Sequence, residues 1–299
     1  MEPGVDHQCS PDRFRVSLLL VNYKTYTELT ACLHSLEDFV TGDLEVIVVD
    51  HATEPAGAAA VVQRFPWIHL IGIDENPGFA SGVNRAAQVA AGRYFLLLNP
   101  DCVVSADVAG ALADWLDEHP HVGACGALVR ESNGTIQASA RRFPDVTTGL
   151  GGRTSWLTRA WPTNLLTRRN LGPGAGATAP TEVDWVTGAC MMVRRDGFDA
   201  VGGMDEKFFM YWEDADLCFR LKRAGWPTVY NPMVEVTHLT GRSSTYVPRE
   251  SLIAFHRSAF RYFNKHSGRG ARLLVPLVYL ALQARLLAQL VSLRLSRPA

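Results

Sequence analysis

The sequence predicts an α/β fold built on a mostly parallel sheet with helices on both faces. Apolar runs of strand length alternate with helical patterns through the first 130 residues, which is typical of a parallel sheet. The runs at 16–21 and 44–49 are apolar except for Ser17 and Glu45, as expected for strands buried on both faces. The chain has 299 residues, 47% of them hydrophobic, so it can bury a large core.

The elements follow in order. Leu29, Leu33 and Leu36 recur at helical spacing after the first strand, and the small residues of 79–90 suit a helix packed closely on a sheet. An acid-rich helix is expected to begin near residue 213, and a short strand is expected at 227–230. The predicted strands are 16–21, 44–49, 68–73, 94–98 and 122–129, and the predicted helices are 24–39, 56–65, 79–90, 106–118, 251–263 and 273–284.

Polar groups follow four of these strands. In a parallel sheet the carboxyl ends of the strands meet at one edge, where ligands bind. We therefore expect a nucleotide-sized crevice there, rather than four unrelated loops. The groups are Asn22-Tyr23, Asp50, Asn76-Pro77-Gly78 and Asn99-Pro100-Asp101.

Three carboxylates crowd the stretch after residue 212. Glu213, Asp214 and Asp216 follow an aromatic run and open a helical pattern, so they lie in a first turn, where the helix dipole favours negative charge. Capping alone could explain them. Neighbouring apolar surface can instead raise the proton affinity of a carboxylate, as a general base requires; the residues alone leave both interpretations open.

Asp101 is also placed to hold a hard divalent cation against phosphate oxygens. His238 is a second candidate ligand, although a lone histidine is more often structural. The six cysteines are scattered without a C-x-x-C pair, which argues against a zinc site. The net charge of −1 and the absence of a signal-like start indicate a cytoplasmic protein that does not bind nucleic acid.

The C-terminal segment 246–299 is basic and leucine-rich. Its apolar run 273–284, bounded by Arg272 and Arg285, is shorter than the ~20 residues of a membrane span. It suits a helix lying in a membrane surface, or one packed on the body. We assign it as a segment separate from a domain at 14–245. Within that domain the Gly- and Pro-rich stretch 131–180 is expected to be a flexible insertion or loop region, either a lid or a tolerated insertion.

Taken together, the ordered motifs resemble those of family 2 glycosyltransferases with the GT-A fold, a Rossmann-like nucleotide-diphospho-sugar transferase fold, and most of all the rhamnosyltransferase-type members. The resemblance covers about residues 16–245. Many motifs in order are far more specific than any one alone. The matching segments are 16–22, 48–50, 75–84, 97–101, 187–191, 202–206, 213–218 and 238–243.

The resemblance implies a role for each matching residue. Asp50 would accept a hydrogen bond from the donor's base, Asp101 would bind Mg²⁺ or Mn²⁺ together with His238, and Asp214 would be the catalytic base, with Glu213 beside it. The implied donor-binding residues are Asn22, Tyr23, Asp50, Asn76, Gly78, Asn84, Asn99 and Asp101, and the implied acceptor-side residues are Gly188, Ala189 and Trp212.

This chain departs from the family pattern at two positions. Asn99 replaces the first acid of the D-x-D motif, and His51 follows Asp50 where the family commonly has Asn or a small polar residue. The Q-x-x-R-W motif of processive synthases is absent, which implies transfer of one sugar rather than polymerisation.

The resemblance thus implies an inverting transferase. It would move one sugar, with TDP-rhamnose as the leading donor among TDP- and UDP-sugars, to a saccharide or polyprenyl-linked acceptor in cell-envelope or polysaccharide synthesis. It would work in the cytoplasm at the inner face of the membrane, with its C-terminal tail as the peripheral contact. An inactive nucleotide-sugar binding protein with the same fold is the alternative; a nucleotidyltransferase is disfavoured because no Gly-rich loop follows the first strand.

Overall fold

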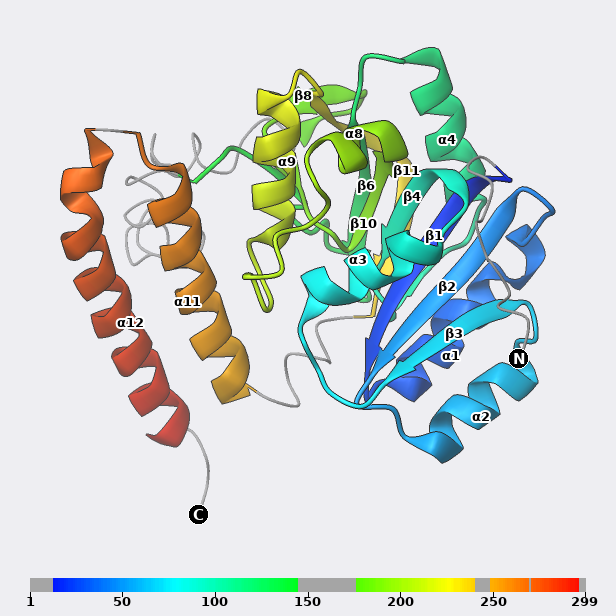
Figure 1. Cartoon of the computed structure of the whole chain (residues 1–299), viewed down its shortest axis with the longest axis horizontal. Helices are drawn as coiled ribbons and strands as arrows, with labels where there is room; N and C mark the ends of the chain where they lie inside the picture. Colours follow the sequence, from blue (N-terminus) through cyan, green and yellow to red (C-terminus); the bar gives the residue numbers. More distant parts are fainter. Residues whose placement is uncertain (1–12, 145–175, 240–247, 269, 296–299) are drawn as a thin grey trace, which may run out of the picture.

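The computed structural model describes residues 13–144, 176–239, 248–268 and 270–295 (Figure 1). It confirms the α/β prediction for the first hundred residues nearly element by element. These elements are β1 (Phe14–Tyr23), α1 (Tyr26–Leu36), the 3-10 turn η1 (Glu37–Phe39), β2 (Leu44–His51), α2 (Pro55–Arg64), β3 (Ile68–Ile73), α3 (Phe79–Val89) and β4 (Gly92–Leu98).

Strands β1 to β4 are parallel and lie side by side in the order β3-β2-β1-β4. Their carboxyl ends share one edge, as the sequence predicted. Asn22 of β1 pairs in register with Asp50 of β2, so these two polar side chains start out as neighbours.

The other half of the sheet is mixed. It contains β5 (Cys102–Val103), β6 (Ala124–Glu131), β8 (Thr181–Val183), β10 (Cys190–Arg194) and β11 (Thr228–His238). The order continues β4-β10-β6-β11-β5, with β10 antiparallel to both of its neighbours. A separate two-stranded sheet joins β7 (Ala140–Arg141) to β9 (Trp185–Val186).

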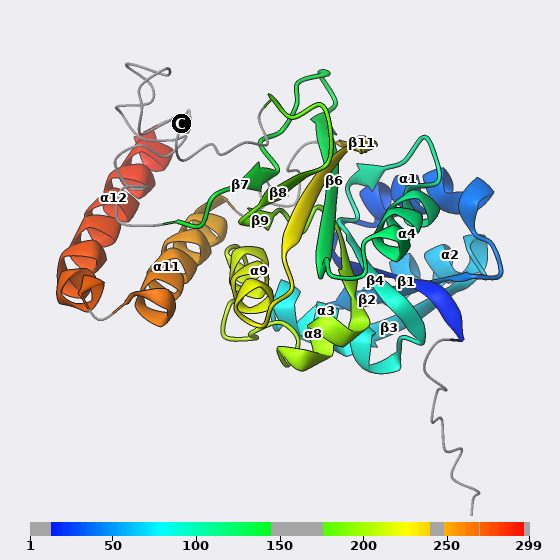
Figure 2. The same cartoon turned by 90° about the horizontal axis from the view of Figure 1, so that it is seen from above.

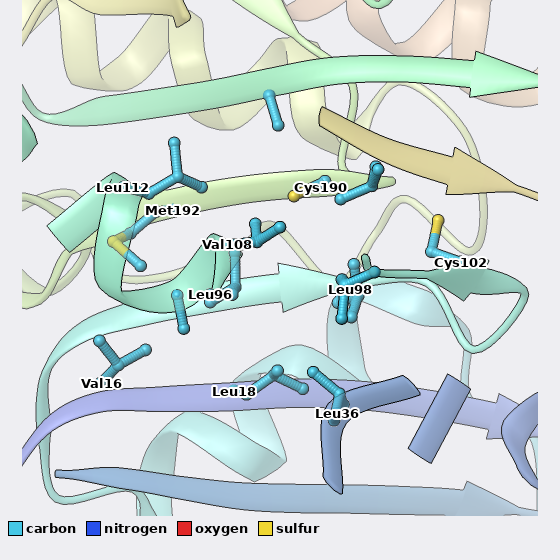
Figure 3. Packing of buried hydrophobic residues seen from close by; sticks show 14 of the residues in the cluster. Val16, Leu18, Leu36, Leu96, Leu98, Cys102, Val108, Leu112, Cys190 and Met192 are labelled. Carbon is cyan, nitrogen blue, oxygen red and sulfur yellow. The ribbon is translucent and has the colours of Figure 1, made fainter. Parts of the chain in front are cut away.

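Side chains on the two faces of the sheet form two cores because successive strand residues point to opposite faces. Leu18 and Leu20 of β1 pack with α1 and with α4 (Val108–Glu118); Figure 3 shows Leu18 in this layer with Leu96, Met192 and Leu112. Leu19 and Val21 pack on the other face, with α3, α8 (Arg195–Ala200) and α9 (Glu213–Arg223).

One predicted strand is much longer in the structure than expected. The strand expected at 227–230 is β11, which continues to His238 through a register shift between Asn231 and Glu235. Pro232 lies in that irregularity, where a residue without an N–H is tolerated. His238 therefore ends a strand and does not begin a polar loop as expected.

The C-terminal segment forms a helical hairpin beside the sheet domain (Figures 1 and 2). Helix α11 (Pro248–His266) is followed by η3 (Ala271–Leu274) and α12 (Val275–Leu295), and α12 packs on α11. The expected apolar run of 273–284 was too short: the helical stretch Ala271–Leu295 has the length and composition to cross a membrane, and none of α12 is buried. Of the predicted insertion 131–180, residues 145–175 lie outside the described part of the chain.

Candidate functional site

The first part of the site is a buried polar network at the ends of β1 and β2. Asp50 is fully buried and accepts hydrogen bonds from Asn22 Nδ2 and from the Tyr26 hydroxyl, both at 2.7 Å. Thr25 Oγ1 donates to Asn22 Oδ1 at 2.7 Å. Burial, together with the bond to Asp50, raises the pKa of Tyr26 to about 12, so its hydroxyl stays a donor. The network fixes both oxygens of Asp50 at the end of β2, one held by Asn22 and the other by Tyr26.

A second contact fixes the loop after β3. Asn76 Oδ1 accepts from Gly78 N and from His51 Nδ1, each at 3.1 Å. His51 is buried, and its Nε2 has no partner among the described residues. Burial lowers the pKa of His51, so the ring is neutral and Nδ1 carries the proton. The histidine that departs from the family pattern thus positions Asn76 and leaves the Asn76 amide hydrogens available.

The predicted metal residues come together from β11 and the loop after β4. His238 Nε2 donates to Asp101 Oδ1 at 2.9 Å, and both side chains are buried. Their ligand atoms and Cys102 Sγ lie within 4.8 Å of one another. Burial lowers the pKa of His238, but the hydrogen bond and charge of Asp101 outweigh it, so the net shift is upward.

This donor set fits a divalent cation at two of its three positions. Asp101 offers a carboxylate and His238 an imidazole, which together suit Mn²⁺, while carboxylate oxygen also suits Mg²⁺. Burial raises the pKa of Cys102 well above its usual range, and its thiol points at the Ala189 carbonyl. A protonated thiol does not ligate these hard cations, so Asp101 and His238 are the pair that could hold one.

Residues 187–189 connect this cluster to the acidic helix. Ala189 O accepts from Asn99 N at 3.0 Å and from Cys102 Sγ at 3.5 Å. The preceding residue, Gly188, donates its N–H to Asp214 Oδ2 at 3.2 Å. One short segment therefore sets the position of the Asp101 loop on one side and of Asp214 on the other.

Glu213 and Asp214 differ in their access to solvent. Glu213 is buried, with Oε2 unpartnered among the described residues; burial first, and then the charges of Asp214 and Asp216, raise its pKa well above its usual range. Asp214 is half-buried and accepts from Ala215 N and Gly188 N. Burial raises the pKa of Asp214 while these N–H groups oppose it. Burial and the neighbouring charges thus favour the protonated form of Glu213, and Asp214, the less buried of the two, is the carboxylate available as a base.

Backbone strain marks the residues just before the acids. Tyr211 and Trp212 have φ of 68° and 71°, a left-handed conformation rare for large side chains. Phe79 N, at the start of α3, donates to Phe209 O at 2.9 Å. Gly78 has φ of 101°, and a Cβ there would lie 2.3 Å from Phe209 O. Glycine at 78 is therefore required for the aromatic loop to sit against α3.

Asn84, Tyr23 and Trp212, which were also predicted to belong to the site, have other surroundings. Asn84 bonds through both ends of its amide to the loop before α9: Nδ2 donates to Met204 O and Glu206, and Oδ1 accepts from Met204 N. Tyr23 lies exposed at the end of β1. Asn84 thus holds a loop, while Trp212 caps the acidic helix. No local pattern indicates Tyr26 as a partner of Asp50, because that contact depends on how α1 packs.

Comparison with known proteins identifies relatives. Residues 17–202 match the model of the family described as Glycosyl transferase family 2. The chain is 33% identical over 267 residues to N-acetylglucosaminyl-diphospho-decaprenol L-rhamnosyltransferase of Mycobacterium tuberculosis (strain ATCC 25618 / H37Rv), covering 84% of this chain and 85% of that protein. It is 28% identical over 170 residues to Rhamnosyltransferase WbbL of Escherichia coli (strain K12), covering 56% and 61%.

Solved structures share the fold at low sequence identity. Mannosyltransferase PcManGT from Pyrobaculum calidifontis, in complex with GDP-Man and Mn²⁺, aligns with a TM-score of 0.59 at 17% identity, covering 98% of this chain and 79% of that one. TarS of S. aureus aligns with a TM-score of 0.54 at 15% identity, covering 89% and 43%. These neighbours confirm the expected GT-A fold with C-terminal helices.

Proposed function

Because this chain belongs to glycosyl transferase family 2, we propose that it is a metal-dependent, inverting transferase that moves a single sugar. It is a glycosyltransferase of cell-envelope glycan synthesis; the donor, the acceptor and the stereochemistry are our inference. One observation carries the proposal: residues 187–189 hold an accessible carboxylate, Asp214, on one side and the Asp101–His238 pair on the other.

Each part of the site has a task in this reaction. Asp50, fixed by Asn22 and Tyr26, accepts a hydrogen bond from the base of the donor. Asp101 and His238, whose side chains meet, would hold Mg²⁺ or Mn²⁺, and the ion would compensate the charge of the donor's diphosphate. Asn76, held by His51, presents its amide hydrogens to the donor.

Asp214 takes the proton of the acceptor hydroxyl. The acceptor oxygen forms a bond to the anomeric carbon as the bond from that carbon to the diphosphate breaks, and the bonding electron pair leaves with the diphosphate. Glu213 is buried, and its surroundings favour its protonated form, so it is a poor nucleophile for a two-step reaction. A single displacement by the acceptor inverts the anomeric configuration.

The relatives favour a particular donor and acceptor. The Mycobacterium tuberculosis relative is named for rhamnosyl transfer to N-acetylglucosaminyl-diphospho-decaprenol, and the Escherichia coli relative is a rhamnosyltransferase. Rhamnose from TDP-rhamnose is therefore our leading donor, ahead of other TDP- and UDP-sugars, and a polyprenyl-linked saccharide our leading acceptor.

Helix α12 is the part of the chain suited to meet a membrane that carries such an acceptor. Leu277, Leu280 and Leu287 are each more than 60% exposed, and 271–295 contains arginine but no acid. At 1.5 Å per residue the helix is about 32 Å long. Arg285 near its middle disfavours a crossing, so we propose that α12 lies in the membrane surface at the inner face.

The test of the reaction is a donor panel. The purified chain is incubated with Mn²⁺ or Mg²⁺, a polyprenyl-diphospho-N-acetylglucosamine analogue, and TDP-rhamnose, UDP- or GDP-sugars; transfer is read by mass spectrometry and the new linkage by NMR. We expect metal-dependent transfer from TDP-rhamnose with inversion. Tight nucleotide binding without turnover on any donor would instead favour the inactive binding protein.

The membrane contact is tested by flotation with vesicles containing anionic lipid. We expect the wild type to float with the vesicles, and a Leu280→Glu/Leu287→Glu variant to remain below them. The matched control is Ile136→Glu/Met233→Glu, which places the same two charges at exposed apolar positions of the sheet domain. Equal flotation of the wild type and the α12 variant would refute the contact.

A further inference from the structure

Helix α11 lies beside the acidic helix α9 (Figures 1 and 2), and two independent sets of contacts join them. One set of contacts is made to Asp216, after the Glu213-Asp214 pair in the sequence, and the other to residues 210–212, before that pair. In both sets the partners lie on α11, which begins more than thirty residues later in the chain.

The first set is a buried ion cluster around Asp216, whose side chain is 0% exposed. Lys265 Nζ lies 2.6 Å from Asp216 Oδ1, and His266 Nε2 donates to the same oxygen at 2.7 Å. Arg220 Nε donates to Oδ2 at 2.7 Å. Lys265 also reaches Asp205 at 2.7 Å, so the end of α11 is fixed to both α9 and the loop that leads to it.

The second set holds the aromatic loop. Ser258 Oγ donates to the Met210 carbonyl at 2.9 Å. The ring of Phe255 lies 5.8 Å from that of Tyr211 and 5.6 Å from that of Trp212. Tyr262 adds a third ring contact, 5.5 Å from Trp212.

These contacts bear on the strained backbone of Tyr211 and Trp212. A left-handed conformation costs a non-glycine residue free energy and persists only where the surroundings impose it. The side chains of both residues contact α11, and the carbonyl just before them accepts from α11. Trp212 is the N-cap of α9, so its backbone conformation sets the orientation of the first turn of α9, which carries Asp214.

We propose that α11 is a positioning element for the catalytic base, fastened through Asp216 by Lys265 and His266. The proposal rests on the proposed function, in which Asp214 is that base. It makes α11 a part of the catalytic unit and not of a separate C-terminal segment. The role is positioning, because α11 acts on Asp214 through its neighbours.

The test removes the two α11 partners of Asp216 while preserving shape. Lys265→Met keeps the chain length, and His266→Phe keeps a ring in contact with Phe219. The matched control is Lys222→Met. Lys222 lies on α9, as Asp216 does, and the change removes its ion pair with Asp184 at 2.8 Å. Lys265→Arg restores the charge. Steady-state kinetics and amide hydrogen exchange of 208–218 are measured for each variant well below its unfolding temperature.

We expect the double variant Lys265→Met/His266→Phe to lose at least tenfold in kcat, because small displacements of reacting groups are costly, with the KM for the donor changed less than twofold. Exchange of 208–218 should accelerate at least tenfold. Lys222→Met should change neither, and Lys265→Arg should recover most of kcat. If the double variant does not fold, Lys265→Met alone and Ser258→Ala should each show a smaller loss of kcat and a smaller acceleration of exchange in 208–218.

The outcomes separate the two proposals. Unchanged hydrogen exchange in 208–218, or turnover within twofold of wild type in the double variant, overturns the positioning role. A wild type without turnover on any donor overturns the proposed function, while the exchange measurement still decides whether α11 fixes this segment.

Discussion

Asp214 and Asp216 lie two residues apart on α9, and their replacement by asparagine should have opposite effects. Asp214→Asn should abolish most activity and leave stability nearly unchanged. Asp216→Asn should destabilise the protein. The contrast separates a carboxylate kept for chemistry from one kept for structure.

The stability effect follows from the sign of each pKa shift. Burial opposes ionisation of Asp216, but His266, Arg220 and Lys265 lower its pKa from 3.8 to about 2. A lowered pKa stabilises the fold above about pH 4, and this contribution is lost as pH falls toward 2. This lowering of the pKa corresponds to ~2–3 kcal/mol at neutral pH, or roughly 4 °C in Tm for a chain of this size.

The sign is reversed for Asp214. Burial raises its pKa, so the ionised form at neutral pH opposes folding, and this cost is relieved as pH falls through the folded-state value. Asparagine removes the charge but keeps one acceptor for Gly188 or Ala215; the lost hydrogen bond costs about 1 kcal/mol. Loss of the base should lower kcat by about a hundred- to ten-thousandfold.

Thermal and urea unfolding at pH 7 and at steps down to pH 2.5, with kcat at pH 7, measure both effects. The stability gap between wild type and Asp216→Asn should shrink by more than half between pH 4 and pH 2.5. The reasoning is refuted if Asp214→Asn loses more stability than Asp216→Asn, or keeps kcat within tenfold of wild type.

Two further predictions concern the loop and the metal pair. Gly78→Ala should lower Tm and kcat, because its Cβ would meet Phe209 O at 2.3 Å; Gly134→Ala, which also has positive φ but open surroundings, isolates backbone strain, and equal losses in the two variants would exclude the contact. His238→Ala should weaken Mn²⁺ binding at least tenfold by calorimetry, with the exposed His69→Ala unchanged; full Mn²⁺ affinity in His238→Ala would remove it from the metal pair.

Local patterns were enough to predict the parallel half of the fold. The strand at 68–73 has the predicted bounds, and the helix after Gly78 differs at one end only, since apolar runs and turn residues reflect local preferences. The antiparallel β10 was not predicted, because its neighbours β4 and β6 come from distant parts of the chain. The full length of α12 was missed because the bounding arginine, Arg285, did not end the helix.

The positions of site residues were predictable where those residues lie at or near the end of a strand or helix that the local sequence indicates. Asp50, Asp101 and Asp214 lie where the sequence placed them, and their roles stay predictions. Asp216 was grouped with its neighbours as a first-turn acid, because nothing near it reveals the partners at 265 and 266. Ionic partners fifty residues away have no local pattern.

The central position of β10 has a consequence for how the chain folds. This strand, at residues 190–194, lies between β4 and β6. The two halves of the sheet therefore cannot be joined until about two-thirds of the chain has been synthesised. Until then β4 exposes an apolar edge, which invites pairing with other chains. Such long-range pairing slows folding, and we expect nascent chains ending before β10 to depend on chaperones in a way that chains ending after it do not.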